Sequence, residues 1–319
     1  MAVRREELLT RLRETLAKTG FFISDPHNIR SISFDIIARR DKELLIIKAL
    51  SNIDSLSGDD AEVLRILATT LGGSPMVIGL HSSSAKLDHG ILYSRFGIPI
   101  ISEATFHEHM LEGVPPFVYA APGGLYVRLD GELLRKIRED RNISLGMLAE
   151  IAGVSRKAIQ MYESGMGAMV EIAAKLEEYL NEPIVVPLNP FAYTLEVAKT
   201  LRTFDEFKGL NRDVFEMLKE IGYSVTPTIR CPFDALASEQ DVLLLTGVED
   251  DVKMMVRKAR VVGNISRVTE KKSVIFVQQE TSTESIEGTP LITKDELRRA
   301  DDADDVLELI LKRERRRKT

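Results

Sequence analysis

The most informative stretch of the sequence is SLGMLAEIAGVSRKAIQMYESG, residues 144–165. Ser144 and Ser155 each stand where a side chain can cap the start of a helix. Gly153 falls between the two helices, at a tight turn that needs a left-handed backbone conformation. Ala149 is small, so the two helices can approach each other closely. This spacing predicts a helix-turn-helix, a pair of crossed helices.

The same stretch resembles the Cro/repressor-type helix-turn-helix domain, which has a Leu-Ala pair, a Gly-Val-Ser turn and a Tyr-Glu-x-Gly ending at fixed spacing. The matching residues are Leu145, Leu148, Ala149, Gly153, Val154, Ser155, Ile159, Tyr162, Glu163 and Gly165. The resemblance implies a five-helix domain with residues 170–180 among its later helices. It also implies that the helix at 155–162 lies in the major groove of DNA.

Three side chains near the start of that helix are candidates for reading bases. Arg156, Lys157 and Gln160 are expected on its exposed side, whereas Ile159 faces inward. Arginine can bond guanine through two hydrogen bonds, and glutamine can do the same with adenine. These three residues are therefore the predicted base readers.

Contacts to the DNA backbone have separate candidates. The helix starts at Ser144 and Ser155 present backbone N–H groups that can bind phosphates. Arg138 and Arg141 precede the motif and are two further candidates for phosphate contacts.

Segments rich in proline and glycine divide the chain. The expected parts are an N-terminal α/β domain (1–112), a connector hairpin (113–130), the helix-turn-helix domain (131–182), a C-terminal α/β domain (192–311) and a basic tail (312–319). We therefore expect a mixed α/β fold class with an inserted all-α domain.

The C-terminal α/β region repeats the N-terminal one. Hydrophobic patterns predict the order α-β-β-β-α-β-β-α for residues 1–112. Phe233-Asp234 matches Phe34-Asp35 at an offset of 199, and Val274 matches Val77 further along. These matches predict an internal duplication, while spacings that any two α/β domains share are the alternative explanation.

The order of elements, with Asp35 on one strand and Lys48 on the next, resembles the restriction-endonuclease-like fold. Active members carry an Asp and then Glu/Asp-x-Lys, and their carboxylates hold Mg²⁺. Here the second motif reads Ile46-Ile47-Lys48, so its acid is missing. In the second copy Asp234 remains, but the aligned triplet is Leu245-Thr246-Gly247. The resemblance therefore implies a catalytically degenerate scaffold, and the alternative is that Asp35 and Lys48 are ordinary strand residues.

The composition further limits the classes of protein and of site that are compatible with this sequence. The net charge of −6 argues against a protein that is basic all over, but it leaves room for a local basic surface. The single cysteine, Cys231, excludes an internal disulfide framework. The five histidines lack a chelating constellation, and we expect no catalytic residue, cofactor or metal. With no signal peptide or membrane-spanning run, a cytoplasmic protein is expected.

Over nearly its whole length the chain resembles an archaeal family of helix-turn-helix transcriptional regulators, through residues 34–39, 113–126 and the motif above. The resemblance implies a non-enzymatic, sequence-specific regulator that binds double-stranded DNA. A homodimer is expected, since one helix-turn-helix reads only a few base pairs; no effector is indicated. Two alternatives stay open: a nuclease-like DNA-processing protein with a degenerate Asp35/Lys48 site, and a protein-interaction adaptor.

Overall fold

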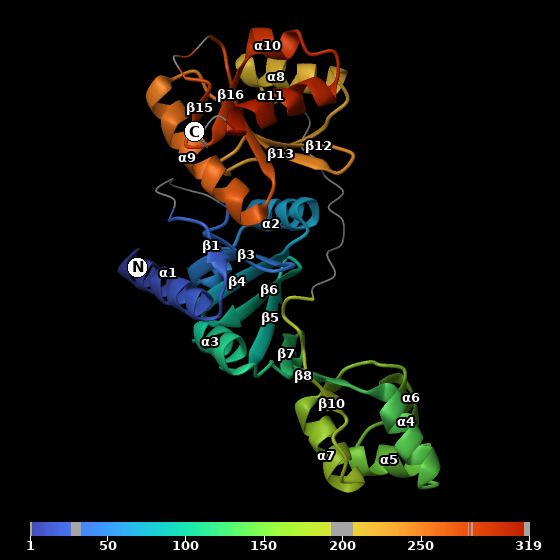
Figure 1. Cartoon of the computed structure of the whole chain (residues 1–319). Helices are drawn as coiled ribbons and strands as arrows, with labels where there is room; N and C mark the ends of the chain where they lie inside the picture. Colours follow the sequence, from blue (N-terminus) through green and yellow to red (C-terminus); the bar gives the residue numbers. More distant parts are fainter. Residues whose placement is uncertain (1, 27–32, 193–206, 280, 282, 316–319) are drawn as a thin grey trace. The chain divides into compact units, whose positions relative to one another are not determined.

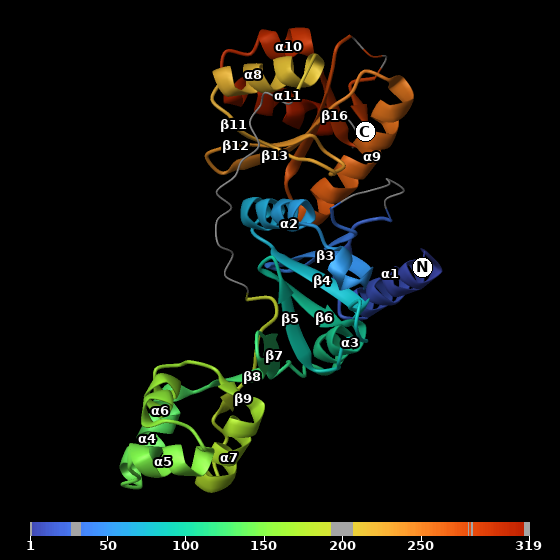
Figure 2. The same cartoon turned by 180° about the vertical axis from the view of Figure 1, so that it is seen from behind.

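The computed structural model describes residues 2–26, 33–192, 207–279, 281 and 283–315 (Figures 1 and 2). The chain divides into two compact units, of which the first holds Met1–Thr19, Ala49–Ser57 and Met76–Thr194 and the second holds Gly20–Lys48, Gly58–Pro75 and Leu195–Thr319. This division differs from the three expected domains, because part of the region 1–112 belongs with the C-terminal region.

The first copy of the α/β fold begins with an amphipathic helix whose Leu8, Leu12 and Leu16 are buried and which is followed by Gly20 at a φ of 80°. Its elements are α1 (Ala2–Lys18), β1 (Phe22–Ile23), β2 (Ile36–Arg40), β3 (Glu43–Asn52), the 3₁₀ helix η1 (Ile53–Ser55), α2 (Gly58–Leu71), β4 (Ser74–His81), β5 (Ile91–Arg95), β6 (Ile98–Ser102) and α3 (Glu103–Glu112). Strand β5 is one more than the predicted order contained. Only Ile91 of its five residues is fully buried, so it lacks the apolar run that marks the neighbouring strands.

The second copy has the same kinds of elements. They are α8 (Leu210–Glu220), β11 (Ser224–Pro227), β12 (Ala235–Glu239), β13 (Val242–Val248), α9 (Val252–Thr269), β14 (Lys272–Val277), β15 (Ser285–Ile286), β16 (Thr289–Thr293), α10 (Lys294–Arg298) and α11 (Ala303–Arg315). Its core includes Phe215, Leu244 and Phe276, which pack between the sheet and its helices.

The two sheets share one topology. The first contains the order β1-β2-β3-β4-β6-β5, and the second has the order β11-β12-β13-β14-β16-β15. Ile36 pairs with Ile47 in the first sheet and Ala235 with Thr246 in the second, which keeps the offset of 199. The shared order and register support the duplication.

One strand needs a different alignment from the one expected. Val77 pairs with Ile100 in the first sheet, whereas Ile275 pairs with Leu291 in the second. Leu291 follows Pro290 as Ile100 follows Pro99, so these two residues correspond. Val77 therefore corresponds to Ile275 rather than to Val274. The two aliphatic runs are similar enough for the sequence match to slip by one residue.

The copies contact each other within the second unit, where α9 packs on β2. The guanidinium of Arg39 donates to the Thr269 carbonyl at 3.0 Å and forms an ion pair with Glu270 at 2.5 Å. The Asn264 side chain accepts a hydrogen bond from the Asp25 backbone N–H and donates one to the Asp25 carboxylate, both at 2.7 Å. These contacts explain why a segment of the first copy belongs to the second unit.

The helix-turn-helix region follows the first copy within the first unit. Its elements are β7 (Val118–Ala121), β8 (Gly124–Leu129), α4 (Gly131–Asp140), α5 (Leu145–Ala152), α6 (Arg156–Glu163), β9 (Ala168–Met169), α7 (Val170–Leu180) and β10 (Val185–Val186). Strand β7 pairs in parallel with β5, and β8 pairs with β7, β9 and β10 (Figures 1 and 2). The described residues 131–182 thus contain four helices rather than the five that the resemblance implied, together with strand β9.

Part of the expected basic tail is helical, because α11 continues to Arg315. Arg313 is only 8% exposed; its guanidinium donates to the Leu291 carbonyl and forms an ion pair with Glu296. Residues 316–319 of that tail, and residues 193–206 of the expected C-terminal domain, lie outside the described residues. Among the helices that the structure describes, none combines the length and the apolar character that crossing a membrane requires.

Candidate nucleic-acid interface

Helices α5 and α6 form the helix-turn-helix, and side chains fix both of their starts. Ser144 Oγ accepts a hydrogen bond from the Met147 N–H at 3.1 Å, and Ser155 Oγ accepts one from the Ala158 N–H at 3.1 Å. Gly153 follows α5 with a φ of 71°, in the left-handed region. The two caps and the glycine turn therefore set the direction in which α6 leaves α5.

A small apolar core holds this region together. Leu148, Ala149 and Ile159 are buried in it, at the crossing of α5 and α6. A Cβ atom on Gly131 would lie 2.6 Å from the carbonyl oxygen of Glu163. Glycine at the start of α4 thus allows the end of α6 to pack closely against it.

The three predicted base readers lie together on one face of α6. Arg156, Lys157 and Gln160 are exposed, whereas Ile159 is buried. A Cβ atom on Gly146 would lie 3.0 Å from Arg156 Nε, so the guanidinium rests against the first turn of α5. The face therefore offers an arginine fork, an ammonium and a carboxamide in one contiguous surface.

The two arginines predicted to bind phosphates make contacts within the domain. Arg138 donates to the Glu163 carboxylate at 2.5 and 3.2 Å, and the two side chains are 14% and 9% exposed. The hydrogen bonds to Glu163 raise the pKa of Arg138, while burial acts in the opposite direction. Arg141 donates to the Leu180 carbonyl at 2.5 Å and to Glu182 at 3.0 Å. Both guanidinium groups position helices in this structure.

The nuclease-like position of the first copy combines one carboxylate with a buried lysine. Pairing of Ile36 with Ile47 places Asp35 opposite Lys48, and Lys48 is 8% exposed. Ile46 stands where an active site would supply the second acid. One carboxylate beside an ammonium does not fit a Mg²⁺ ion, which prefers several oxygen ligands.

A loop of the second copy lies beside this position. The backbone N–H of Ser33 donates to the Arg230 carbonyl at 2.9 Å. Burial raises the pKa of the neighbouring Cys231 thiol to about 12, while a hydrogen bond with Thr228 and the charge of Lys48 act to lower it. Because Ser33 is two residues before Asp35, its hydrogen bond to Arg230 places this loop of the second copy close to the degenerate position.

The second copy holds its lysine in a different way. Asp234 is opposite Gly247, and the ammonium reaches it from α9. Lys258 Nζ donates to Asp234 Oδ2 at 2.9 Å and to the Val248 carbonyl at 2.7 Å, and it lies 3.5 Å from Glu249 Oε2. The single ammonium group of Lys258 is therefore shared by two carboxylates and a backbone carbonyl.

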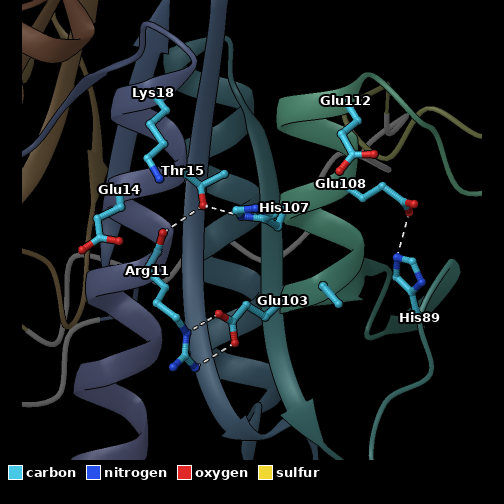
Figure 3. A pocket seen from close by; sticks show the side chains of 10 residues that line it. Arg11, Glu14, Thr15, Lys18, His89, Glu103, His107, Glu108 and Glu112 are labelled. Atoms are coloured by element: carbon cyan, nitrogen blue, oxygen red, sulfur yellow. Dashed lines mark hydrogen bonds and ion pairs between the residues drawn. The ribbon is translucent and has the colours of Figure 1, made fainter.

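A groove of about 580 Å³ lies between α1 and α3 (Figure 3). Arg11 forms a two-point ion pair with Glu103, His107 Nδ1 lies 3.1 Å from Thr15 Oγ1, and His89 Nε2 lies 2.7 Å from a Glu108 oxygen. The first two pairs join α1 to α3, and the third joins the segment before β5 to α3. Within the described residues, no set of three or more His, Cys, Asp or Glu side chains is placed to hold a metal ion; His27 lies outside those residues.

The fold and this interface define a class: a helix-turn-helix protein whose exposed second helix is carried by a nuclease-like α/β scaffold. Residues 5–116 match the model of a PD-(D/E)XK superfamily domain, and residues 134–186 match a helix-turn-helix model. The order of elements and the degenerate motif pointed to the first match, and the 144–165 spacing pointed to the second.

Several relatives match the chain over nearly its whole length. Proteins named "Putative HTH-type transcriptional regulatory protein" from Methanocella arvoryzae, Halorubrum lacusprofundi and Thermococcus gammatolerans are 41%, 37% and 36% identical to the chain. The matches cover 97%, 96% and 98% of this chain and 97%, 96% and 99% of those proteins. The chain belongs to this family of archaeal helix-turn-helix-type regulatory proteins. No solved structure gives a significant match.

Sequence reasoning missed two features of these sites. Lys258 and Glu249 lie outside the triplet that aligns with the first copy, so the strand motif alone does not find them. Met161 is 42% exposed on α6, although methionine at that spacing is more often part of a core. The exposure of Met161 could have been predicted from the sequence, because Met161 follows Lys157 by four residues and so lies on the same side of the helix.

Proposed function

We propose that this protein is a sequence-specific transcriptional regulator that binds double-stranded DNA and places α6 in the major groove. The observation that carries the proposal is the exposed face of Arg156, Lys157 and Gln160 on a helix whose direction is fixed by two caps. In this arrangement Arg156 and Lys157 can pair with guanine, and Gln160 with adenine. The names of the relatives agree with this role.

We assign the phosphate contacts to the starts of α5 and α6, where the backbone N–H groups beyond Ser144 and Ser155 face outward in a helix-turn-helix. Arg138 and Arg141 then act by holding α4 and α7 in place, through Glu163 and through the Leu180 carbonyl. A phosphate contact would weaken binding to all sequences alike, whereas a base contact would change the preferred sequence.

The test is selection of binding sites from random duplexes with the full chain, followed by titration of the selected duplex. Arg156→Ala and Gln160→Ala should each weaken specific binding by about 1–3 kcal/mol and relax the preference at one position. Lys136→Ala, an exposed lysine on α4, is the matched control and should change binding by less than about twofold. Failure to enrich any sequence would contradict the proposal.

We infer that the scaffold is not a nuclease and that regulation does not involve cleavage. The inference rests on two observations. Ile46 stands in place of the second acid of the first copy, and Asp234 of the second copy is bound by the ammonium group of Lys258. Incubation of the selected duplex with the protein and Mg²⁺ should leave the DNA intact. Cleavage that disappears in Asp35→Ala would contradict this inference and favour the nuclease-like alternative.

We further propose that the protein acts as a homodimer on a pseudo-palindromic site, in the cytoplasm where an archaeal chromosome lies. One α6 helix reads only a few base pairs, and half-sites separated by about one helical turn would double the contact. The α9–β2 contact joins the two copies of one chain, so a second chain would use other surfaces of the α/β region. Sedimentation of the full chain with its duplex should give two chains per duplex, and one chain per duplex would contradict the dimer.

A further inference from the structure

The outer face of α6 carries one apolar side chain beside its polar readers. Met161 is 42% exposed and follows Gln160 directly. At about 100° per residue, Met161 lies about 40° around the helix from Lys157 and one turn further along. The same geometry puts Met161 about 160° from Ile159, which faces the core. Met161 therefore belongs to the surface that meets the groove.

An apolar side chain in the major groove has only one good partner. Hydrogen-bond donors and acceptors make up most of the base edges there, and the C5-methyl group of thymine is the apolar exception. Against cytosine or guanine, the thioether would cover polar groups without satisfying them, which costs free energy. The chemistry of Met161 thus selects one base.

We propose that Met161 reads the C5-methyl group of a thymine, next to the adenine contact of Gln160. An A·T pair offers both groups, since adenine presents N6 and N7 while its partner presents the methyl group. Gln160 and Met161 are consecutive residues on the exposed face, so they can read one A·T pair or two neighbouring pairs. This inference rests on the proposed function and names the sequence preference of its site.

The test replaces thymine by uracil, one position at a time, in the duplex selected by the full-length wild-type protein. Uracil keeps the base pair and removes only the methyl group. Losing contact with one buried methyl group should weaken wild-type binding about fourfold at a single position. Met161→Ala should bind the thymine and uracil duplexes equally, at about the wild-type affinity for the uracil duplex. Because Met161 is exposed, this variant is expected to keep its fold.

Met254→Ala is the matched control, since Met254 is 49% exposed on α9 in the second copy. This variant should keep the full uracil effect. Wild-type protein that tolerates uracil at every position would overturn the inference, as would a uracil effect that persists in Met161→Ala. Both results leave DNA binding itself intact. Selection that enriches no sequence would instead overturn the proposed function, and the methyl contact with it.

Discussion

The two copies of the α/β fold place a lysine near the same aspartate position by different routes. In the first copy Lys48 stands on β3, opposite Asp35. In the second copy that strand position is Gly247, and Lys258 arrives from α9 to bind Asp234. Atoms Cγ and Cδ of Lys258 lie 3.6 and 3.1 Å from the place of a Cβ on Gly247. Losing the side chain on the strand thus leaves room for the lysine of the helix.

A short strand motif therefore does not describe this site. The register of β2–β3 and β12–β13 is the same, yet the basic group of the second copy comes from a residue eleven positions after Gly247. In both copies a lysine belongs to the elements next to the aspartate, but it comes from the neighbouring strand in the first copy and from α9 in the second. Variants of the second copy can therefore show how much the contacts of Lys258 contribute to the free energy of unfolding.

Removing the ammonium is expected to have the largest effect. Lys258→Met leaves the carboxylates of Asp234 and Glu249 without their shared cation, and it leaves the Val248 carbonyl without this donor. Breaking such a partly buried pair should lower the free energy of unfolding by about 2–4 kcal/mol. Chemical denaturation of the full chain measures the loss.

Two further variants make that experiment specific. Lys253→Met changes an exposed lysine of the same helix and should stay within about 0.5 kcal/mol of wild type. In an Ile275→Val background, which lacks the atom that a Cβ at position 247 would meet, the double variant Gly247→Lys, Lys258→Ala moves the lysine to the strand, as in the first copy, and should recover part of the loss. A Lys258→Met protein as stable as the Lys253→Met control would show that the ion cluster contributes little.

A smaller loss of stability is expected when the contact between the two copies is weakened. Asn264 is 6% exposed and bonds both the backbone N–H and the carboxylate of Asp25 at 2.7 Å. Asn264→Ala removes both bonds and should lower the free energy of unfolding by about 1–3 kcal/mol. Asn264→Asp keeps an acceptor for the N–H but sets a second carboxylate against Asp25, so it should cost at least as much. Thermal unfolding of both variants checks the order.

A smaller loss is expected from Gly247→Ala. The new Cβ would lie 2.4 Å from Ile275 Cδ1, the far end of a side chain that can turn aside. We expect a loss of about 1–2 kcal/mol. Ile275→Val lacks the clashing atom, so Gly247→Ala should cost less in that background. Equal losses in both backgrounds, measured by a double-mutant cycle, would place the strain elsewhere.

Local patterns made much of the fold predictable. Ser144, Gly153 and Ser155 act on their own neighbours, so spacing alone indicated the helix-turn-helix. The constant offset between Asp35 and Asp234 indicated the duplication. The pairing of Arg138 with Glu163 and the reach of Lys258 were not predictable, because each depends on packing between elements far apart in sequence. Strand β5 was missed for another reason: it lacks an apolar run.

Replacing Thr246 is expected to stabilise the protein. Thr246 is fully buried, and among the described residues its Oγ1 has no hydrogen-bond partner, whereas the matching residue of the first copy is the apolar Ile47. Thr246→Val keeps the shape and removes an unsatisfied hydroxyl, so it should raise the free energy of unfolding by about 0.5–1 kcal/mol. Thr228→Val is the contrasting variant: its Oγ1 donates to the Phe233 carbonyl at 2.6 Å, and its loss should destabilise the protein. If Thr246→Val destabilised the chain as much as Thr228→Val, the hydroxyl would have a partner in solution, and the second copy would use a polar contact where the first uses packing.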